Sequence, residues 1–139
     1  MHSIKKLSQV EITNLINNAT DSPLRRSRIL LHESLSERVH QMVIAIHDSS
    51  EVPMHRHPKG KAESYLVLHG CLSVRYFNDE GELIDLIEYL PYENSAGFFF
   101  GRHQGGTWHQ PFVKEGWAIY LETYEGPFNK EIDVELFAS

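Results

Sequence analysis

A single cysteine, Cys71, leaves the chain without a partner for an internal disulfide. The amino-terminal stretch contains no continuous apolar segment of signal-peptide length. With 41% hydrophobic and 23% charged residues, the composition is typical of a soluble globular domain and not of a disordered or membrane-spanning chain. We therefore expect a protein that works in the reducing cytoplasm, away from membranes.

Basic residues are scarce as well. The chain carries 13 lysines and arginines against 19 aspartates and glutamates, which gives a formal net charge of −6. The basic residues that do cluster, such as Arg25, Arg26 and Arg28, are too few to form the positive surface that binds a phosphate backbone. Nucleic acids are therefore not expected as partners, and a small molecule is the expected ligand.

The length of 139 residues fits one domain, and neither an internal repeat nor a long linker divides it. Ser8 and Glu11 have the spacing of a capping box, which predicts a helix over 7–18. The helix is expected to end before Pro23, because proline pushes the preceding residue out of the helical region. We divide the chain into a helical extension at 1–28, a main domain at 29–127, and a tail that packs on the barrel at 128–139.

After the helix the pattern changes to short runs of β-branched, aromatic and leucine residues separated by turn signals. These predicted strands are 29–32, 39–46, 63–69, 71–77, 82–90, 97–101 and 117–124. The run at 82–90 also has apolar residues at helical spacing, but the NDEG turn before it favours a hairpin. Many short strands with no helical pattern between them predict an antiparallel sandwich or a small barrel.

Three consecutive phenylalanines, Phe98, Phe99 and Phe100, cannot all face one side of a strand. We expect at least one of them in the core and another at a pocket or a subunit interface. Exposed sheet edges and aromatic side chains together favour a homodimer.

Histidine has the most unusual count, with nine in the chain. His55 and His57 are two residues apart on an extended chain, so they project to the same side. Glu63 follows a stretch whose proline and glycine can turn the chain back toward them, and His109 follows a glycine-rich turn. Imidazoles with one carboxylate suit a divalent transition metal (Fe, Mn, Ni, Co or Zn) better than calcium or magnesium. Four protein ligands leave a coordination position open, as a catalytic site requires.

These residues resemble the two sequence motifs of the cupins. The first motif is matched by His55, His57, Glu63 and Gly70, and the second by Gly106 and His109. The resemblance covers about 29–127 and implies an all-β fold, the cupin double-stranded β-helix or small jelly-roll barrel, with a short amino-terminal helical extension. It also implies that His55, His57, Glu63 and His109 meet around a metal ion inside the barrel.

The chain departs from the cupin motifs at three points. Ser49 stands where the first motif has glycine, and Gln104 stands where the second has proline. Five residues, and not three or four, separate His57 from Glu63. A longer connection shifts the register of Glu63, so His103 is an alternative ligand.

Within the cupins, the stretches RRSRILLHES, HRHP and ETYEGPF are similar to the WbuC-type proteins of bacterial O-antigen and surface-polysaccharide gene clusters. This resemblance implies a metal-loaded cupin for a small sugar-like or carboxylated metabolite. Arg28, His32 and Tyr120 are the expected substrate-binding residues, because guanidinium groups pair with carboxylates and the other two can face the cavity. The alternatives are a solvated Arg28 and a buried hydrogen bond for His32.

Three classes of function follow from a metal in such a barrel. As an enzyme, the protein would use the ion as a Lewis acid for isomerisation, epimerisation or hydrolysis, or, with iron(II), for dioxygen chemistry. As a non-catalytic module, it would bind or sense a small ligand. As a structural site, the ion would only staple the barrel, which the size of the core makes the least favoured reading.

Overall fold

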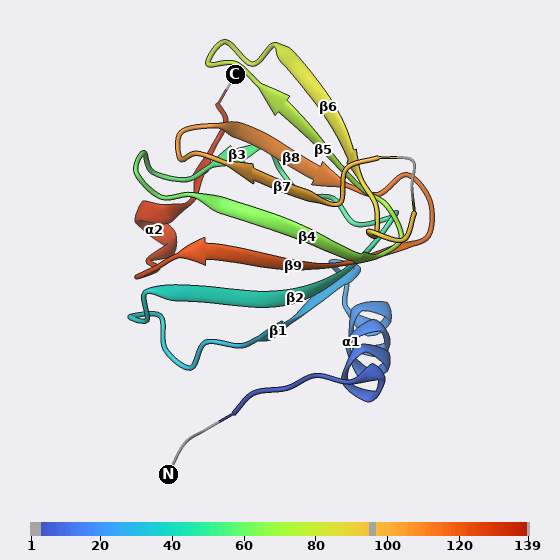
Figure 1. The fold of residues 1–139 in the computed structure, drawn as a ribbon. Helices are drawn as coiled ribbons and strands as arrows, with labels where there is room; N and C mark the ends of the chain where they lie inside the picture. The colour runs from blue at the N-terminus through green and yellow to red at the C-terminus, as the bar shows by residue number, and fades with distance from the viewer. Residues whose placement is uncertain (1–3, 95–96, 139) are drawn as a thin grey trace.

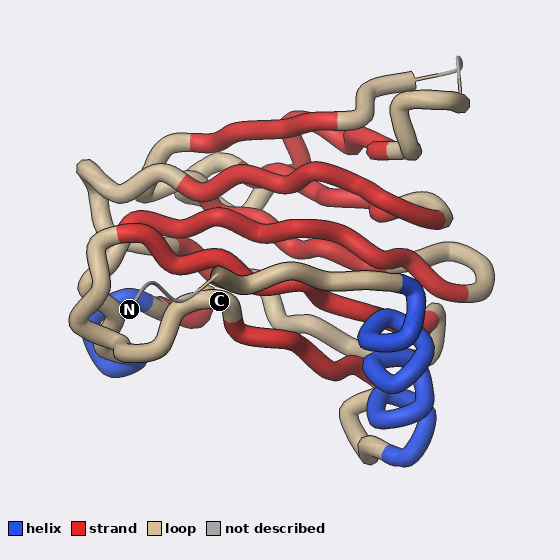
Figure 2. Tube along the Cα trace, turned by 60° about the horizontal axis from the view of Figure 1, so that its bottom comes forward, coloured by secondary structure: helices blue, strands red, loops and turns tan. Residues whose placement is uncertain are grey.

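The computed structural model describes residues 4–94 and 97–138, and within them two five-stranded antiparallel sheets face each other (Figures 1 and 2). Sheet A consists, in spatial order, of β1 (Arg26–Leu30), β2 (Val39–His47), β9 (Trp117–Glu125), β4 (Glu63–His69) and β7 (Phe100–His103). Sheet B consists of β10 (Glu135–Leu136), β3 (His55–Arg56), β8 (Trp108–Phe112), β5 (Leu72–Phe77) and β6 (Leu83–Tyr89). The helices are α1 (Gln9–Asp21) and the short α2 (Lys130–Asp133). The predicted all-β architecture with an amino-terminal helix is confirmed.

The core lies between the sheets and is filled from alternate strand positions. In β4 the buried residues are Glu63, Tyr65 and Val67, while the residues between them are partly exposed. Because strand side chains alternate between faces, all three enter the space between the sheets. Tyr120 of β9 enters the same space, with its ring centroid 5.5 Å from that of Tyr65. The interior is therefore apolar and aromatic, with a few polar groups placed inside it.

Helix α1 covers part of the outer face of sheet A. The Ser8 side chain accepts from the helix amides and Glu11 reaches back to the Ser8 amide, so the predicted capping box is present. The helix ends at Asp21, because Ser22 adopts an extended conformation before Pro23. The residues that join helix and sheet form one apolar cluster: Leu15, Ala19, Val43, Ala45 and Ile119. Among the described residues, neither helix has the length and apolar character needed to span a bilayer.

The run at 82–90 forms the second strand of a hairpin and not a helix. Strands β5 and β6 pair antiparallel, with Val74 opposite Ile87. The side chain of Asn78 accepts from the amides of Glu80 and Glu82 and so builds the turn between the strands. The hairpin prediction is confirmed.

The three phenylalanines at 98–100 lie at the sheet margin. Phe98, Phe99 and Phe100 are 66%, 41% and 49% exposed, so the expectation that one of them is in the core is wrong. Strand β7 begins only at Phe100 and is the outermost strand of sheet A. An edge strand has no neighbour on one side, which leaves these rings uncovered.

Gly70 turns the chain from β4 to β5. Its φ is +75°, and a Cβ atom there would lie 2.0 Å from the carbonyl oxygen of Trp117. Only glycine meets both conditions, because other residues disfavour positive φ and carry the atom that would clash. This turn places Glu63 and Tyr65 in one strand of sheet A and Leu72 in sheet B.

Candidate metal centre

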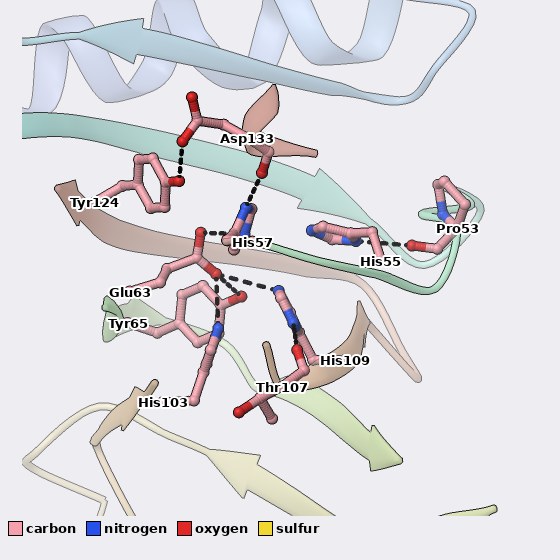
Figure 3. A network of polar contacts seen from close by, with 10 residues as sticks. All are labelled: Pro53, His55, His57, Glu63, Tyr65, His103, Thr107, His109, Tyr124 and Asp133. Atoms are coloured by element: carbon pink, nitrogen blue, oxygen red, sulfur yellow. Dashed lines mark hydrogen bonds and ion pairs between the residues drawn. The ribbon is translucent and has the colours of Figure 1, made fainter. Parts of the chain in front are cut away.

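Three of the predicted ligands come from the neighbouring strands β3 and β8 and from the residue after β3 (Figure 3). His55 stands directly opposite His109, with 4.3 Å between ring centroids. His57 follows His55 onto the same side, and its ring centroid is 5.2 Å from that of His109. The two-residue spacing therefore does bring the three rings together.

Glu63 and His103 come from the facing sheet. Glu63 is the first residue of β4 and pairs with His103, the last residue of β7. Their exposed fractions are 3% and 9%, and His109 is completely buried. The five-residue connection after His57 thus does not turn Glu63 away from the histidines.

Four of these side chains converge closely. His57, Glu63, His103 and His109 each offer one ligand atom, and these atoms all lie within 4.8 Å of one another. The Glu63 carboxylate is at the centre of the group: its Oε2 is 3.0 Å from Nε2 of His57, and its Oε1 is 3.3 Å from Nε2 of both His103 and His109. His55 lies beside this group but outside it.

The buried ring nitrogens lack hydrogen-bond partners. Among the described residues, Nε2 of His57, Nε2 of His109 and both nitrogens of His103 are buried without a hydrogen bond, although the three Nε2 atoms lie 3.0 to 3.3 Å from the oxygens of the Glu63 carboxylate. Buried polar atoms in folded proteins almost always have a hydrogen-bond partner. Several unpaired ring nitrogens around one carboxylate therefore indicate a site that binds a further group. A divalent transition ion accepts the lone pairs of imidazole and carboxylate together. The residues present therefore fit a metal ion.

Backbone carbonyls orient three of the rings. Nδ1 of His55 donates to the carbonyl oxygen of Pro53 at 2.9 Å, and Nδ1 of His57 donates to that of Asp133 at 2.7 Å. Nδ1 of His109 donates to the carbonyl oxygen of Thr107 at 2.9 Å. A carbonyl oxygen only accepts, so each bond places the proton on Nδ1 and leaves Nε2 as a lone pair, as a metal ligand requires. His103 has no such bond.

The charges of the group follow from these contacts. Burial alone would raise the pKa of Glu63, but the contacts with His103, His109 and His57 outweigh it and hold that pKa well below its usual range. Burial opposes the charged form of His57, but Glu63 outweighs it and raises the pKa of His57. Burial, with His109 alongside, lowers the pKa of His55 to about 4. The site thus holds an ionised carboxylate among buried imidazoles.

Tyr65 supports the carboxylate from the core side. Its hydroxyl donates to Oε1 of Glu63 at 2.5 Å. Both residues are on β4, two positions apart, so they face the same interior. A buried hydrogen-bond donor fixes the orientation of the carboxylate that it contacts, as residues that support metal ligands commonly do.

The three predicted substrate-binding residues lie at different depths. Tyr120 is buried, with 4% exposure. Arg28 is exposed on β1, where it pairs with Ile44 of the core and therefore shares its face of the sheet. His32 is half-buried, with Nδ1 3.2 Å from the carbonyl oxygen of Gln41 and its ring centroid 4.0 Å from that of His40.

Glu122 is a second carboxyl group on the interior face. It lies opposite Tyr65 in the pairing of β9 with β4, and so points to the same interior. Burial, followed by the charge of Glu63, raises the pKa of Glu122 well above its usual range, and Arg28 lowers it only in part. The interior therefore contains two carboxyl groups whose pKa values are shifted in opposite directions.

Sequence reasoning missed the residues behind His57. Asp133, Lys61 and Tyr124 form a hydrogen-bonded group around the end of α2. Asp133 is 76 positions from His57, the ring that its carbonyl oxygen contacts. No local spacing signals a contact of that kind, since it exists only once the tail has folded against β3.

Solved structures with this architecture are double-stranded β-helix proteins of the cupin class. An uncharacterised Klebsiella pneumoniae protein with a double-stranded β-helix domain aligns with a TM-score of 0.65 and 14% identity, over 99% of this chain and 100% of that one. A cupin-2 domain protein from Rhodospirillum rubrum aligns with a TM-score of 0.60 and 13% identity, over 81% of this chain and 66% of that one. An oxalate oxidase solved with the substrate analogue glycolate aligns with a TM-score of 0.59 and 15% identity, over 84% and 57%. The fold is thus the predicted cupin double-stranded β-helix.

Sequence comparison places the chain in one family. It belongs to the family described as Domain of unknown function (DUF6016), whose profile matches residues 7–89. The match includes His55, His57 and Glu63 and ends before His103 and His109. No curated protein is detectably similar in sequence.

Proposed function

We propose that the protein is a metal-dependent cupin that acts on a small sugar-like or carboxylated metabolite. The observation that carries the proposal is the set of buried ring nitrogens around Glu63 that have no hydrogen-bond partner among the described residues. A divalent transition ion (Fe, Mn, Ni, Co or Zn) bound there supplies a Lewis acid with coordination positions left for substrate oxygens or water.

His55, His57, Glu63 and His109 are the residues that we propose to hold the ion. Orientation supports this set, because all three rings present Nε2 after donating Nδ1–H to a carbonyl oxygen. Proximity instead supports His103 in place of His55. The two criteria agree on three residues and differ on the fourth, which mutagenesis can decide.

Arg28, His32 and Tyr120 are the proposed substrate-binding residues. Arg28 lies on the interior side of β1, and its charge acts on Glu122 of β9, whose pKa burial raises; this pair suits a ligand carrying both carboxylate and hydroxyl groups. A groove of about 800 Å³ also borders Glu63 and is lined by Arg38 and Arg102. These arginines favour an anionic ligand, and the oxalate oxidase of the same fold was solved with a small hydroxy acid.

The similarity of RRSRILLHES, HRHP and ETYEGPF to WbuC-type proteins supports a sugar-like metabolite of O-antigen or surface-polysaccharide biosynthesis. We further propose that the protein is cytoplasmic and forms a homodimer. The exposed rings of Phe98, Phe99 and Phe100 on an edge of sheet A support the dimer, because such surfaces favour association.

The test begins with protein purified without a nickel column, whose metal content is measured by elemental analysis. Metal-loaded and chelated protein are then assayed against a panel of sugar nucleotides, hydroxy acids and keto acids. Turnover that chelation abolishes supports the enzyme. Thermal stabilisation by a panel member without turnover supports the alternative, a non-catalytic small-ligand-binding or sensor cupin. Protein that retains no transition metal under any loading condition contradicts both.

A further inference from the structure

The chain runs back to the metal centre in its last described residues. Residues 129–136, here called the C-terminal clasp, contain α2 and β10. Strand β10 is the outermost strand of sheet B and pairs with β3, with Leu136 opposite His55. The clasp therefore lies along the strand that carries His55 and directly precedes His57.

Asp133 is the anchor of the clasp. It is 2% exposed, although it is a carboxylate. Its Oδ1 accepts from Nζ of Lys61 at 2.8 Å and from the hydroxyl of Tyr124, and its Oδ2 accepts from the amide of Asn129 at 2.7 Å. Burial opposes ionisation, but these bonds outweigh it and lower the pKa of Asp133. A buried charge with three donors is fixed in place, because releasing it leaves a charged group unpaired.

The same residue contacts a ligand ring through its backbone. The carbonyl oxygen of Asp133 accepts from Nδ1 of His57 at 2.7 Å (Figure 3). That bond fixes the proton on Nδ1 and turns Nε2 toward Glu63, 3.0 Å away. Tyr124 also flanks the ring, with 4.8 Å between centroids. The side chain of Asp133 thus sets the position of the carbonyl that orients His57.

Lys61, which contacts Asp133, lies in the part of the chain where the first cupin motif is longer than usual. It lies in the five-residue connection between His57 and Glu63, which is longer than in the motif. Its ammonium group donates to Asp133 and to the carbonyl oxygen of Pro127. The lengthened connection therefore supplies a contact that holds the clasp.

We propose that Asp133 is a positioning residue of the metal centre: its side chain anchors the C-terminal clasp so that its carbonyl orients His57 toward the ion. This inference rests on the proposed function, because it requires that His57 bind metal. A purely structural role would instead make Asp133 important for stability and leave metal affinity unchanged in the folded protein. The two roles are separated by measuring affinity on folded variants.

Co²⁺ is the probe, because its visible absorption reports the ligand geometry as well as the binding. The full chain and its Asp133→Ala, Asp133→Asn and Glu135→Gln variants are titrated at low temperature, after circular dichroism has established that each metal-free protein is folded. Glu135→Gln is the matched control: it removes the ion pair between Glu135 of the clasp and Arg56 of β3, 3.0 Å apart, and leaves Asp133 intact.

We expect Asp133→Ala to bind Co²⁺ about 10- to 100-fold more weakly, the usual effect of removing support behind a metal ligand, with altered absorption bands. Asp133→Asn, which keeps an acceptor oxygen, should fall between this variant and the unaltered protein, and Glu135→Gln should match the unaltered protein. Equal affinity and equal spectra for folded Asp133→Ala would overturn the inference.

Two milder variants keep the test decisive if Asp133→Ala does not fold. Tyr124→Phe and Lys61→Met each remove one donor to Asp133 and leave its carboxylate in place. Weaker Co²⁺ binding by both, with the fold retained, supports the inference, and unchanged binding by both refutes it. Failure of the unaltered protein to bind Co²⁺, Mn²⁺ or Zn²⁺ is a different result, which refutes the proposed function itself.

Discussion

His55 and His109 stand opposite each other on β3 and β8, and each donates Nδ1–H to the carbonyl oxygen of the residue two positions before it. The extended strand thus orients its own imidazoles, since the acceptors, Pro53 and Thr107, are fixed by the same backbone. His103 lies as close to Glu63 as His109 does, yet it has no orienting bond. The fourth metal ligand is therefore His55 if the orientation of the ring decides, and His103 if its distance from the other ligand atoms decides.

Single alanine variants of His55 and His103 decide between the two sets. We expect His55→Ala to lower metal affinity at least about 10-fold, and His103→Ala to lower it less, because of these two rings only His55 has its tautomer fixed by a carbonyl oxygen. Isothermal titration with Zn²⁺ measures both. The double variant His55→Ala and His57→Ala should stay folded and retain no metal in elemental analysis. A larger loss from His103→Ala than from His55→Ala would move His103 into the shell in place of His55.

The metal-free protein should lose stability as the pH falls from about 6.5 toward about 4. The pKa of His55 is lowered to about 4, so the unfolded chain binds a proton in this range that the folded protein does not bind. His103, whose pKa burial also lowers, acts in the same direction. The raised pKa of His57 contributes stability that is fully present below about 6.5 and is lost only as the pH rises further.

Urea unfolding at several pH values between about 5 and 6.5 measures this dependence. Glu122, whose pKa is raised in the folded protein, acts in the opposite direction, so a His55 variant is needed to isolate the contribution of the histidine. Each extra proton on the unfolded state tilts the free energy of unfolding by at most about 1.4 kcal/mol per pH unit. His55→Gln should flatten the slope. A slope that is the same in the variant and the unaltered protein would show that the burial of His55 has no cost for its charged form.

The sequence predicted the parts of the site that depend on short spacing. His55 and His57 share a face because strand side chains repeat every two residues, and Gly70 marks a turn that only glycine can make. The capping box of α1 and the hairpin of β5 and β6 follow from equally local chemistry.

The elements that the sequence did not predict are short or are defined by distant partners. Strand β3 has only two residues, and β8 contains Pro111, so neither shows the alternating pattern of a strand. The contact of Asp133 with His57 and the pairing of Glu63 with His103 join distant parts of the chain. Such contacts arise from the sheet topology, which local periodicity does not determine.

Gly70→Ala should destabilise the protein by about 2–5 kcal/mol, as the sum of a left-handed backbone penalty and an overpacked contact. The clash is with the carbonyl oxygen of Trp117, a backbone atom that cannot swing aside. Gly116→Ala is the matched control: its φ is +74°, but its Cβ would meet nothing within 4 Å, so about 1–2 kcal/mol is expected. Equal losses in thermal or urea unfolding would mean that the close approach to Trp117 contributes nothing.

Tyr65→Phe should weaken metal binding while the fold is retained. The hydroxyl of Tyr65 is a buried donor to Oε1 of Glu63, and its removal leaves the carboxylate free to turn between its histidine neighbours. We expect about a 10-fold loss of metal affinity or more and about 1.5–3 kcal/mol of lost stability, the range for a hydrogen bond to a charged group.

Tyr76→Phe provides the control for this prediction, because it removes another core hydroxyl that bonds to Tyr89 at 2.8 Å and not to Glu63. That variant should also lose stability, yet keep its metal affinity. Titrations of both variants with the same ion separate general loosening of the core from a specific effect on Glu63. If both variants lose affinity equally, the hydroxyl of Tyr65 acts only through packing, and Glu63 is held in place by its histidines alone.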